Sequence, residues 1–126
     1  MRPITLLNED SQVVASAAWM ATTWRERTRG WLGKAEAQPG EGILLVPASS
    51  VHSFGMRFAI DVAFLDRQNR VLKLCPALKP GRLAWGPLFQ WNLQALELPQ
   101  GTLARLNIKV GQTLVVRDRA EEEFRA

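Results

Sequence analysis

The chain has 126 residues, of which 47% are hydrophobic and 22% are charged. A chain of this length builds one hydrophobic core and is too short for two, so we expect a single domain that folds on its own. The composition excludes the low-hydrophobicity, high-charge class of disordered proteins. We expect one β-rich domain over residues 1–118, followed by a charged C-terminal tail over residues 119–126.

The formal net charge is +4 and is unevenly distributed along the chain. Residues 51–117 contain nine lysines and arginines against three acidic residues, whereas acidic residues gather in the C-terminal tail. A basic surface attracts nucleic acid, anionic lipid or an acidic partner, but it defines neither a fold nor a specific ligand. No nucleic-acid recognition motif accompanies the basic residues, so we keep weak binding to nucleic acid or to an acidic surface as a third alternative.

Cys75 is the only cysteine, so no internal disulfide can form, and we expect a reducing, cytoplasmic location. The first apolar residues run directly into the polar stretch 8–11, which is too polar for the core of a signal peptide. No stretch approaches the roughly 20 apolar residues of a membrane helix. We therefore expect neither export nor a membrane partner.

The N-terminal part of the chain predicts a hairpin and then a helix. Apolar segments at 4–7 and 13–18 flank a turn-forming run, which indicates two paired strands. Thr23 and Glu26 have the spacing of a capping box, so a helix of about ten residues, 23–32, should follow. The two tryptophans of this segment fall on one side of the helix and are expected to pack it against the core.

The segment 51–65 carries the most informative strand pattern. Its even positions, from His52 to Phe64, are apolar apart from the histidine, and this period of two is typical of an extended strand. Its 15 residues exceed the usual strand length of about 5–6. We therefore expect a bend near residues 55–59 that divides the segment into two strands.

Shorter elements surround this segment. The segment 76–91 is broken by proline and glycine and is expected to be a long, partly ordered loop. Other patterns predict strands at 43–46, 71–74, 95–98 and 114–116, a hairpin turn at 66–70 and a short helix at 102–106. Together these elements predict a mainly β fold, namely a small barrel-like antiparallel or mixed sheet domain with one to three short helices.

Four motifs follow one another between residues 15 and 117. They are Thr23 and Arg27 with Gly30 to Lys34, Gly42 to Leu45, Val51 to Val62, and Leu96-Glu97 with Gly101 and Gly111. In this order they resemble the motifs of the bacterial and archaeal domain of unknown function 192 family, also called uncharacterised protein family 0127. The chain departs from the family pattern at Gly55, Phe58, Ala59 and Lys34, where the family often has Trp, Asn, Pro and Arg, respectively. The resemblance implies a fold and a candidate surface but no reaction, because no activity is assigned to the family.

Residues that carry catalytic chemistry are few, since the chain has one His, one Cys and no Tyr. His52 and Cys75 both occupy strand positions that follow packing, so we predict that they are not catalytic partners. Neither a zinc-ligand spacing nor a phosphate-binding glycine loop is present in the sequence. We therefore expect no metal and no cofactor.

Three charged residues, Arg57, Asp61 and Glu97, lie in apolar strand patterns, where an isolated charge is costly to bury. We predict that a bend near Gly55 brings the three together. They would then form either a structural ion-pair group or a site in which Arg57 holds a polar ligand that the carboxylates orient. The third alternative for these residues is plain solvent exposure on the outer face of the sheet. Asp61 and Glu97 could also serve as the general acid and base of a small hydrolase.

The broken segment also carries aromatic rings, which either line a ligand cleft or pin the loop onto the core. The preferred function is non-catalytic binding of an unknown small molecule or peptide, and the second alternative is the hydrolase. We assign no catalytic residue, and the sequence leaves the oligomeric state open. The candidate binding residues are Arg57, Asp61, Glu97, His52, Trp85 and Trp91.

Overall fold

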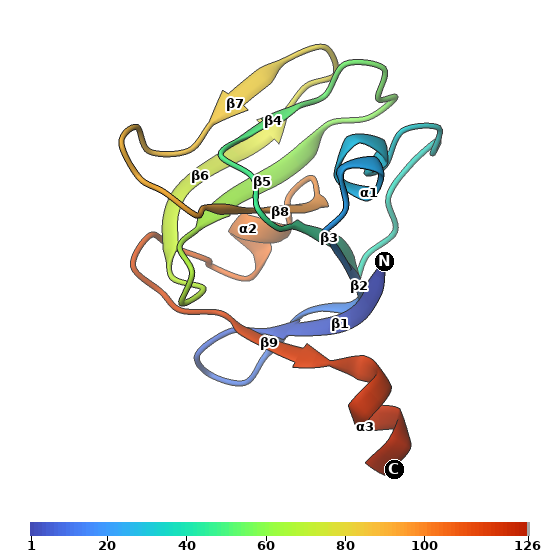
Figure 1. The fold of residues 1–126 in the computed structure, drawn as a ribbon, viewed down its shortest axis with the longest axis vertical. Helices are drawn as coiled ribbons and strands as arrows, with labels where there is room; N and C mark the ends of the chain where they lie inside the picture. The colour runs from blue at the N-terminus through green and yellow to red at the C-terminus, as the bar shows by residue number, and fades with distance from the viewer. Residues whose placement is uncertain (126) are drawn as a thin grey trace.

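The computed structural model describes the backbone of residues 1–125 and the side chains of residues 1–122. The described chain is mainly β, with three short helices, as the sequence predicts (Figure 1). The strands are β1 Arg2–Leu7, β2 Val13–Ala21, β3 Glu41–Leu45, β4 Ser50–His52, β5 Ile60–Leu65, β6 Val71–Leu78, β7 Leu83–Trp85, β8 Gln94–Pro99 and β9 Val115–Asp118. The helices are α1 Trp24–Arg29, α2 Thr102–Arg105 and α3 Arg119–Arg125.

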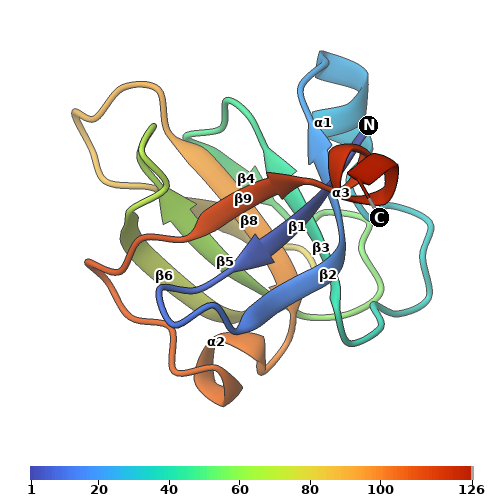
Figure 2. The same ribbon diagram turned by 90° about the horizontal axis from the view of Figure 1, so that it is seen from below.

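Seven strands form one sheet in the order β6-β5-β8-β3-β2-β1-β9, and β4 and β7 form a second, two-stranded sheet. Only β2 and β3 run parallel among the described neighbours, so the large sheet is mixed (Figure 2). The two edges of the sheet meet at an isolated bridge between Arg70 and Thr113 and not along a continuous ladder. The sheet is therefore not closed. The term barrel-like therefore describes this fold only loosely.

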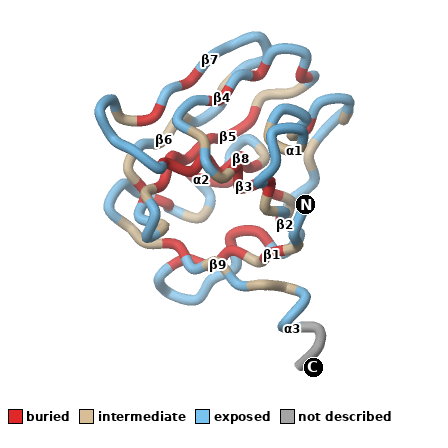
Figure 3. The backbone as a smooth tube through the Cα atoms, viewed as in Figure 1, coloured by how far each residue is buried: buried red, intermediate tan, exposed pale blue. Residues whose placement is uncertain are grey.

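The central strands bury both of their faces, as the red segments in Figure 3 show. All six residues of β5 are buried. Its odd-numbered apolar side chains join one hydrophobic cluster with Leu96 and Leu98, whereas its even-numbered side chains join a second cluster with Ala95. Val51 from β4 and Ala84 from β7 also belong to the second cluster, so the small sheet covers this face of the large one.

The predicted bend within 51–65 is confirmed, since the segment divides into β4 and β5. Gly55 lies in the bend with a φ of +82°, which favours glycine. The buried Ser53 hydroxyl donates to the Lys79 carbonyl at 2.6 Å and accepts from the Arg82 N–H at 2.9 Å. These bonds fix the bend against the turn that precedes β7.

The prediction of a long loop over 76–91 is wrong in part, because β6 continues to Leu78 and β7 occupies Leu83–Trp85. β7 pairs only with β4, so it needs few ladder hydrogen bonds and tolerates the prolines on either side. The opening hairpin, the 66–70 turn, the 95–98 strand and the helix that begins at Thr102 are confirmed.

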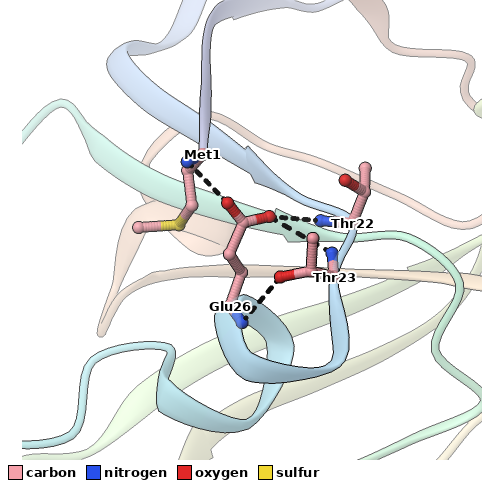
Figure 4. A network of polar contacts seen from close by, with 4 residues as sticks. All are labelled: Met1, Thr22, Thr23 and Glu26. Carbon is pink, nitrogen blue, oxygen red and sulfur yellow. Dashed lines mark hydrogen bonds and ion pairs between the residues drawn. The ribbon is translucent and has the colours of Figure 1, made fainter.

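The capping box of α1 is confirmed: the Thr23 side chain accepts from the Glu26 N–H at 3.2 Å (Figure 4). In return, the Glu26 carboxylate accepts from the N–H groups of Thr22 and Thr23 and contacts the amino group of Met1 at 2.7 Å. The hydrogen bond with the Met1 amino group, followed by those from Thr22 and Thr23, lowers the pKa of Glu26 to about 2.

α1 is shorter than predicted and does not pack by both of its tryptophans. Gly30 ends the helix with a φ of +44°, and its N–H bonds to the Glu26 carbonyl. Trp31 lies beyond the helix and is buried, whereas Trp24 is 72% exposed. The expectation that both rings face the core is wrong. Gly30 turns the chain between the two tryptophans, so Trp24 and Trp31 do not lie on one face of a common helix.

The charged tail forms α3, which lies against the start of the chain. Arg119 donates to the carbonyls of Ile4 and Ser16 and lies over the Trp19 ring, 5.1 Å from its centroid. Ala126, the last residue of the expected tail, lies outside the described residues. None of the helices in the described part of the chain has the length and apolar character needed to span a membrane.

Candidate functional site

A pocket of about 270 Å³ opens beside α1, with one wall from the segment that joins β3 to β4 and with β8 behind it. Its apolar walls include Trp24, Trp31 and Met56. Its polar groups come from separate parts of the chain, with Arg27 on α1, His52 on β4 and Glu97 on β8. The pocket therefore combines an aromatic wall with both acidic and basic groups.

Glu97 is the buried polar group of this pocket, with only 3% of its surface exposed. Its side chain points to the face of the second hydrophobic cluster, because it pairs with Ile43 on one side and Val62 on the other. A Cβ on Gly30 would lie 3.5 Å from Glu97 Oε1, so the turn after α1 passes directly over the carboxyl.

The Glu97 carboxyl has no hydrogen bond or salt bridge to any residue whose side chain the structure describes. Burial without a compensating partner disfavours the charged form and raises the pKa of Glu97 to about 7. Near neutral pH the carboxyl therefore exists both as an acid that can donate and as a carboxylate that can only accept.

Arg27 provides a second unsatisfied group on the wall of the same pocket. Its Nη1 donates to the Pro47 carbonyl at 3.0 Å, which ties α1 to the segment after β3. Its Nε is buried and has no acceptor among the described residues. Since buried polar groups are normally hydrogen-bonded, the unsatisfied Glu97 carboxyl on the wall of this pocket indicates a site that an incoming polar group completes.

The predicted group of Arg57, Asp61 and Glu97 is wrong. Asp61 pairs with Leu98 and Glu97 pairs with Val62, so the two carboxylates are offset by one position and face opposite sides of the sheet. Arg57 lies exposed in the bend between β4 and β5, where it has no salt bridge with either carboxylate. The same geometry excludes Asp61 and Glu97 as the acid and base of a shared cleft.

Asp61 has a structural environment that its sequence position does not reveal. It is 1% exposed, and it accepts from the backbone N–H groups of Ala77 at 2.9 Å, Gly101 at 3.1 Å and Leu103 at 3.0 Å. These donors lie in β6 and at the start of α2. Asp61 therefore fixes two other elements onto the sheet.

The remaining candidates lie in separate places. His52 is on the rim of the pocket, with its ring stacked on Phe54 at 5.5 Å between centroids, whereas Cys75 packs beside the second cluster from β6. The two residues belong to different sheets, in line with the prediction that they are not partners. Trp85 is 53% exposed and Trp91 is 86% exposed, so neither ring pins the loop onto the core.

Trp91 does border a shallow hollow of about 310 Å³ beside the main pocket. Arg27, Pro47, Ala48 and Ser49 line both depressions, so this wall separates the hollow from the Glu97 pocket. A ligand longer than the pocket would extend across this wall toward the Trp91 ring.

Sequence reasoning missed Arg27, Gly30 and Met56 as site residues. A signal for them existed, because Arg27, Gly30 and Trp31 belong to the first family-like motif, Met56 belongs to the third and Glu97 to the fourth. These motifs are far apart in the sequence, yet they meet around one pocket. Two other motif residues, Asp61 and Gly101, instead bond to each other.

The comparisons with known proteins agree with this fold. A crystal structure of a protein of unknown function from Novosphingobium aromaticivorans DSM 12444 is 23% identical, with a TM-score of 0.74, and the match covers 90% of this chain and 83% of that one. A protein from Sinorhizobium meliloti 1021, provisionally described as a transcription regulator, is 15% identical, with a TM-score of 0.74 and coverage of 91% and 92%. At these identities the two structures show the fold alone.

None of the curated proteins matches the chain. The family model DUF192, described as "Uncharacterized ACR", matches residues 5–116, which include all strands except part of β1 and the end of β9. The chain therefore belongs to the domain of unknown function 192 family.

Proposed function

We propose that the protein is a non-catalytic binding domain that takes a small polar ligand in the Glu97 pocket. One observation carries the proposal: the Glu97 carboxyl is 3% exposed, lines an open pocket and has no partner among the described side chains. Leaving such a group unsatisfied costs free energy, and a ligand that pairs with it recovers that cost on binding.

Glu97 defines the chemistry of the ligand. Ionised Glu97 needs a hydrogen-bond donor, and protonated Glu97 needs an acceptor. Hydroxyl and amide groups supply both, so a neutral ligand rich in such groups fits either protonation state. The exposed face of Trp24 adds a flat apolar surface. A pocket of about 270 Å³ suits a ligand about the size of one sugar unit or one amino acid.

The proposal is tested with a panel of neutral monosaccharides and amino-acid amides, titrated into the isotope-labelled protein and followed by nuclear magnetic resonance. At least one probe is expected to shift the indole signals of Trp24 and Trp31 saturably. Glu97→Leu, which keeps a side chain of similar size but removes every hydrogen-bonding atom, should weaken that probe by about tenfold or more. The exposed Glu36→Leu is the matched control and should bind the probe as the native chain does.

Two results would overturn the proposal: no member of the panel shifts the pocket indoles, or Glu97→Leu binds the responding probe as tightly as the native protein. Salt separates the proposed function from the nucleic-acid alternative. Binding of a neutral probe should change little when the salt concentration rises about tenfold, from roughly 50 to 500 mM. Binding of nucleic acid through its phosphates would weaken steeply over this range. We also propose a cytoplasmic location, which the single cysteine supports.

A further inference from the structure

A long acid-free segment forms one side of the molecule. From Arg67 to Leu96 the chain contains five lysines and arginines and no aspartate or glutamate. The segment makes up β6, β7 and the loop that leads to β8, at the top and left of Figure 1. The basic side chains are Arg67, Arg70, Lys73, Lys79 and Arg82; all five are exposed, and none has a salt bridge with a described side chain.

The loop at residues 86–92, within this segment, exposes large apolar side chains. Leu88 is 75% exposed, Phe89 is 95% exposed and Trp91 is 86% exposed. Most of this loop is coloured as exposed in Figure 3. Trp85, at the end of β7, is 53% exposed, and no residue between Leu83 and Leu96 carries a charge. Folded domains rarely leave such bulky apolar side chains side by side in water unless the surface contacts something.

We propose that the side of the molecule formed by this segment binds an anionic lipid bilayer, with the 86–92 loop inserted at the interface and the basic residues against the headgroups. A bilayer surface offers what the face needs, namely an apolar layer for aromatic and aliphatic side chains beneath a layer of negative charge. Tryptophan is favoured at this boundary because its ring is apolar and its N–H is polar. This proposal replaces the sequence-based expectation of no membrane partner, which rested on the absence of a segment able to span a bilayer; surface binding does not need the membrane-spanning helix that the described chain lacks.

Charge argues against two other occupants. A second copy of the chain would bring together two segments that each carry five lysines and arginines and no acidic residue, and the resulting repulsion disfavours a dimer through this side of the molecule. Single-stranded nucleic acid would use the arginines and the indole rings, but it has no apolar layer to receive Leu88, which cannot stack on a base as a ring does. The bilayer accounts for the aliphatic, the aromatic and the basic residues together.

The test is co-sedimentation of the full chain with vesicles of pure phosphatidylcholine and of phosphatidylcholine with a quarter phosphatidylglycerol. The native protein should bind the anionic vesicles about tenfold or more tightly than the neutral ones, and added salt should weaken this binding. Reversing two charges with Lys79→Glu and Arg82→Glu should reduce the affinity by about tenfold or more. Arg117→Glu, an exposed arginine on β9 at the opposite end of the molecule in Figure 1, is the matched control.

The apolar contribution is tested with Phe89→Ser combined with Trp91→Ser, and Val13→Ser, a half-exposed position in the hairpin of β1 and β2, is its control. The double variant should lose most of the binding to anionic vesicles while its thermal midpoint stays that of the native chain. Leu88→Ser alone serves as a second variant that leaves the rings in place. Glu97→Gln should bind vesicles normally, so the test of this inference is independent of the test of the ligand pocket.

Several outcomes would overturn the inference. These are equal binding to neutral and anionic vesicles, no binding to either, or unchanged binding by the Phe89 and Trp91 double variant. Sedimentation velocity that shows a dimer abolished by the double variant would assign the face to self-association. Salt-sensitive binding of a single-stranded oligonucleotide that the double variant loses, with no vesicle binding, would assign the face to nucleic acid.

Discussion

At the scale of single residues, two buried carboxylates on neighbouring strands have opposite environments. Asp61 receives three backbone N–H groups, whereas Glu97 receives none from the described chain. Their positions differ by one step in the register of β5 and β8, which is enough to place one against α2 and the other against the pocket. The same kind of side chain is therefore structural in one case and available to a ligand in the other.

The raised pKa of Glu97 predicts a stability that falls as the pH rises. The folded chain holds the proton up to a pKa of about 7, whereas the unfolded chain releases it near the ordinary value of 4.5. Between these values the native state binds more protons than the unfolded state, so the free energy of unfolding decreases by about 2–3 kcal/mol from pH 5 to pH 8.

The measurement is urea denaturation of the native chain and Glu97→Gln at both pH values. The variant should lack most of this decrease and should gain on the native chain as the pH rises, while the exposed Glu36→Gln should behave like the native chain. An equal loss of stability in Glu97→Gln and the native chain would contradict the assignment.

Removing the Asp61 carboxylate is predicted to destabilise the fold without altering the pocket. Asp61→Ala leaves the N–H groups of Ala77, Gly101 and Leu103 without their acceptor, and each such loss costs about 1–3 kcal/mol. Since some of these groups can reach water, we expect a total of about 3–5 kcal/mol in chemical denaturation.

Asp66→Ala is the matched control, because Asp66 also accepts from backbone N–H groups, those of Gln68 and Arg70, but in an exposed turn. Water can replace that carboxylate, so the cost should stay near 1 kcal/mol or below. Equal costs for the two variants would show that burial does not set the strength of the Asp61 contacts.

At the scale of elements, the capping box determines how α1 presents Arg27 to the pocket. The helix has six residues, none of them buried, so local hydrogen bonds stabilise it more than packing does. Thr23→Ala removes the hydroxyl that accepts from the Glu26 N–H and should lower the free energy of unfolding by about 1 kcal/mol. Thr22→Ala is the control, because only the backbone N–H of Thr22 takes part in the network. Identical thermal midpoints for the two variants would count against the cap.

The sequence predicts elements well where the pattern is local. The Thr23 and Glu26 spacing locates the start of α1, and the period of two in 51–65, with the length of that segment, locates the bend. β7 escapes prediction because its three residues acquire strand structure only by pairing with β4, a contact between distant segments. The exposure of Trp24 could not be predicted for a similar reason. Helical spacing predicts on which side of the helix a ring lies, but not whether another part of the chain covers it.

The candidate site shows the same limit. Glu97 and His52 could be selected as polar residues within strand patterns, and both line the pocket. The grouping with Asp61 could not be tested without the register of β5 against β8, because a shift of one residue exchanges the two faces. Arg27 lies in the first motif, but only the fold brings it to the same pocket as Glu97, which lies 70 residues further along the chain.

At the scale of the whole molecule, the open sheet is joined at one seam. The segment before β9 meets the start of β6 there, through hydrogen bonds from Gly111 to Val71, from Val71 to Gln112 and from Leu114 to Asn69. Glu9, from the hairpin of β1 and β2, accepts from the Thr113 N–H at 2.7 Å and connects the same place to a third element. The seam therefore links the two edges of the sheet without a continuous ladder.

Because few bonds hold it, the seam should open before the centre of the sheet does. Gly111 has a φ of +97°, and a Cβ at this position would meet no atom within 4 Å, so Gly111→Ala introduces backbone strain of about 1–2 kcal/mol without a clash. Hydrogen exchange of the Val71 and Leu114 amides should become faster, while the amides between β5 and β8 keep their native protection. Gly81→Ala is the control, since Gly81 has a φ of +78° and equally open surroundings in the turn before β7. If Gly81→Ala accelerates exchange at the seam as much as Gly111→Ala does, the sheet opens as one unit and the seam is not a separate point of weakness.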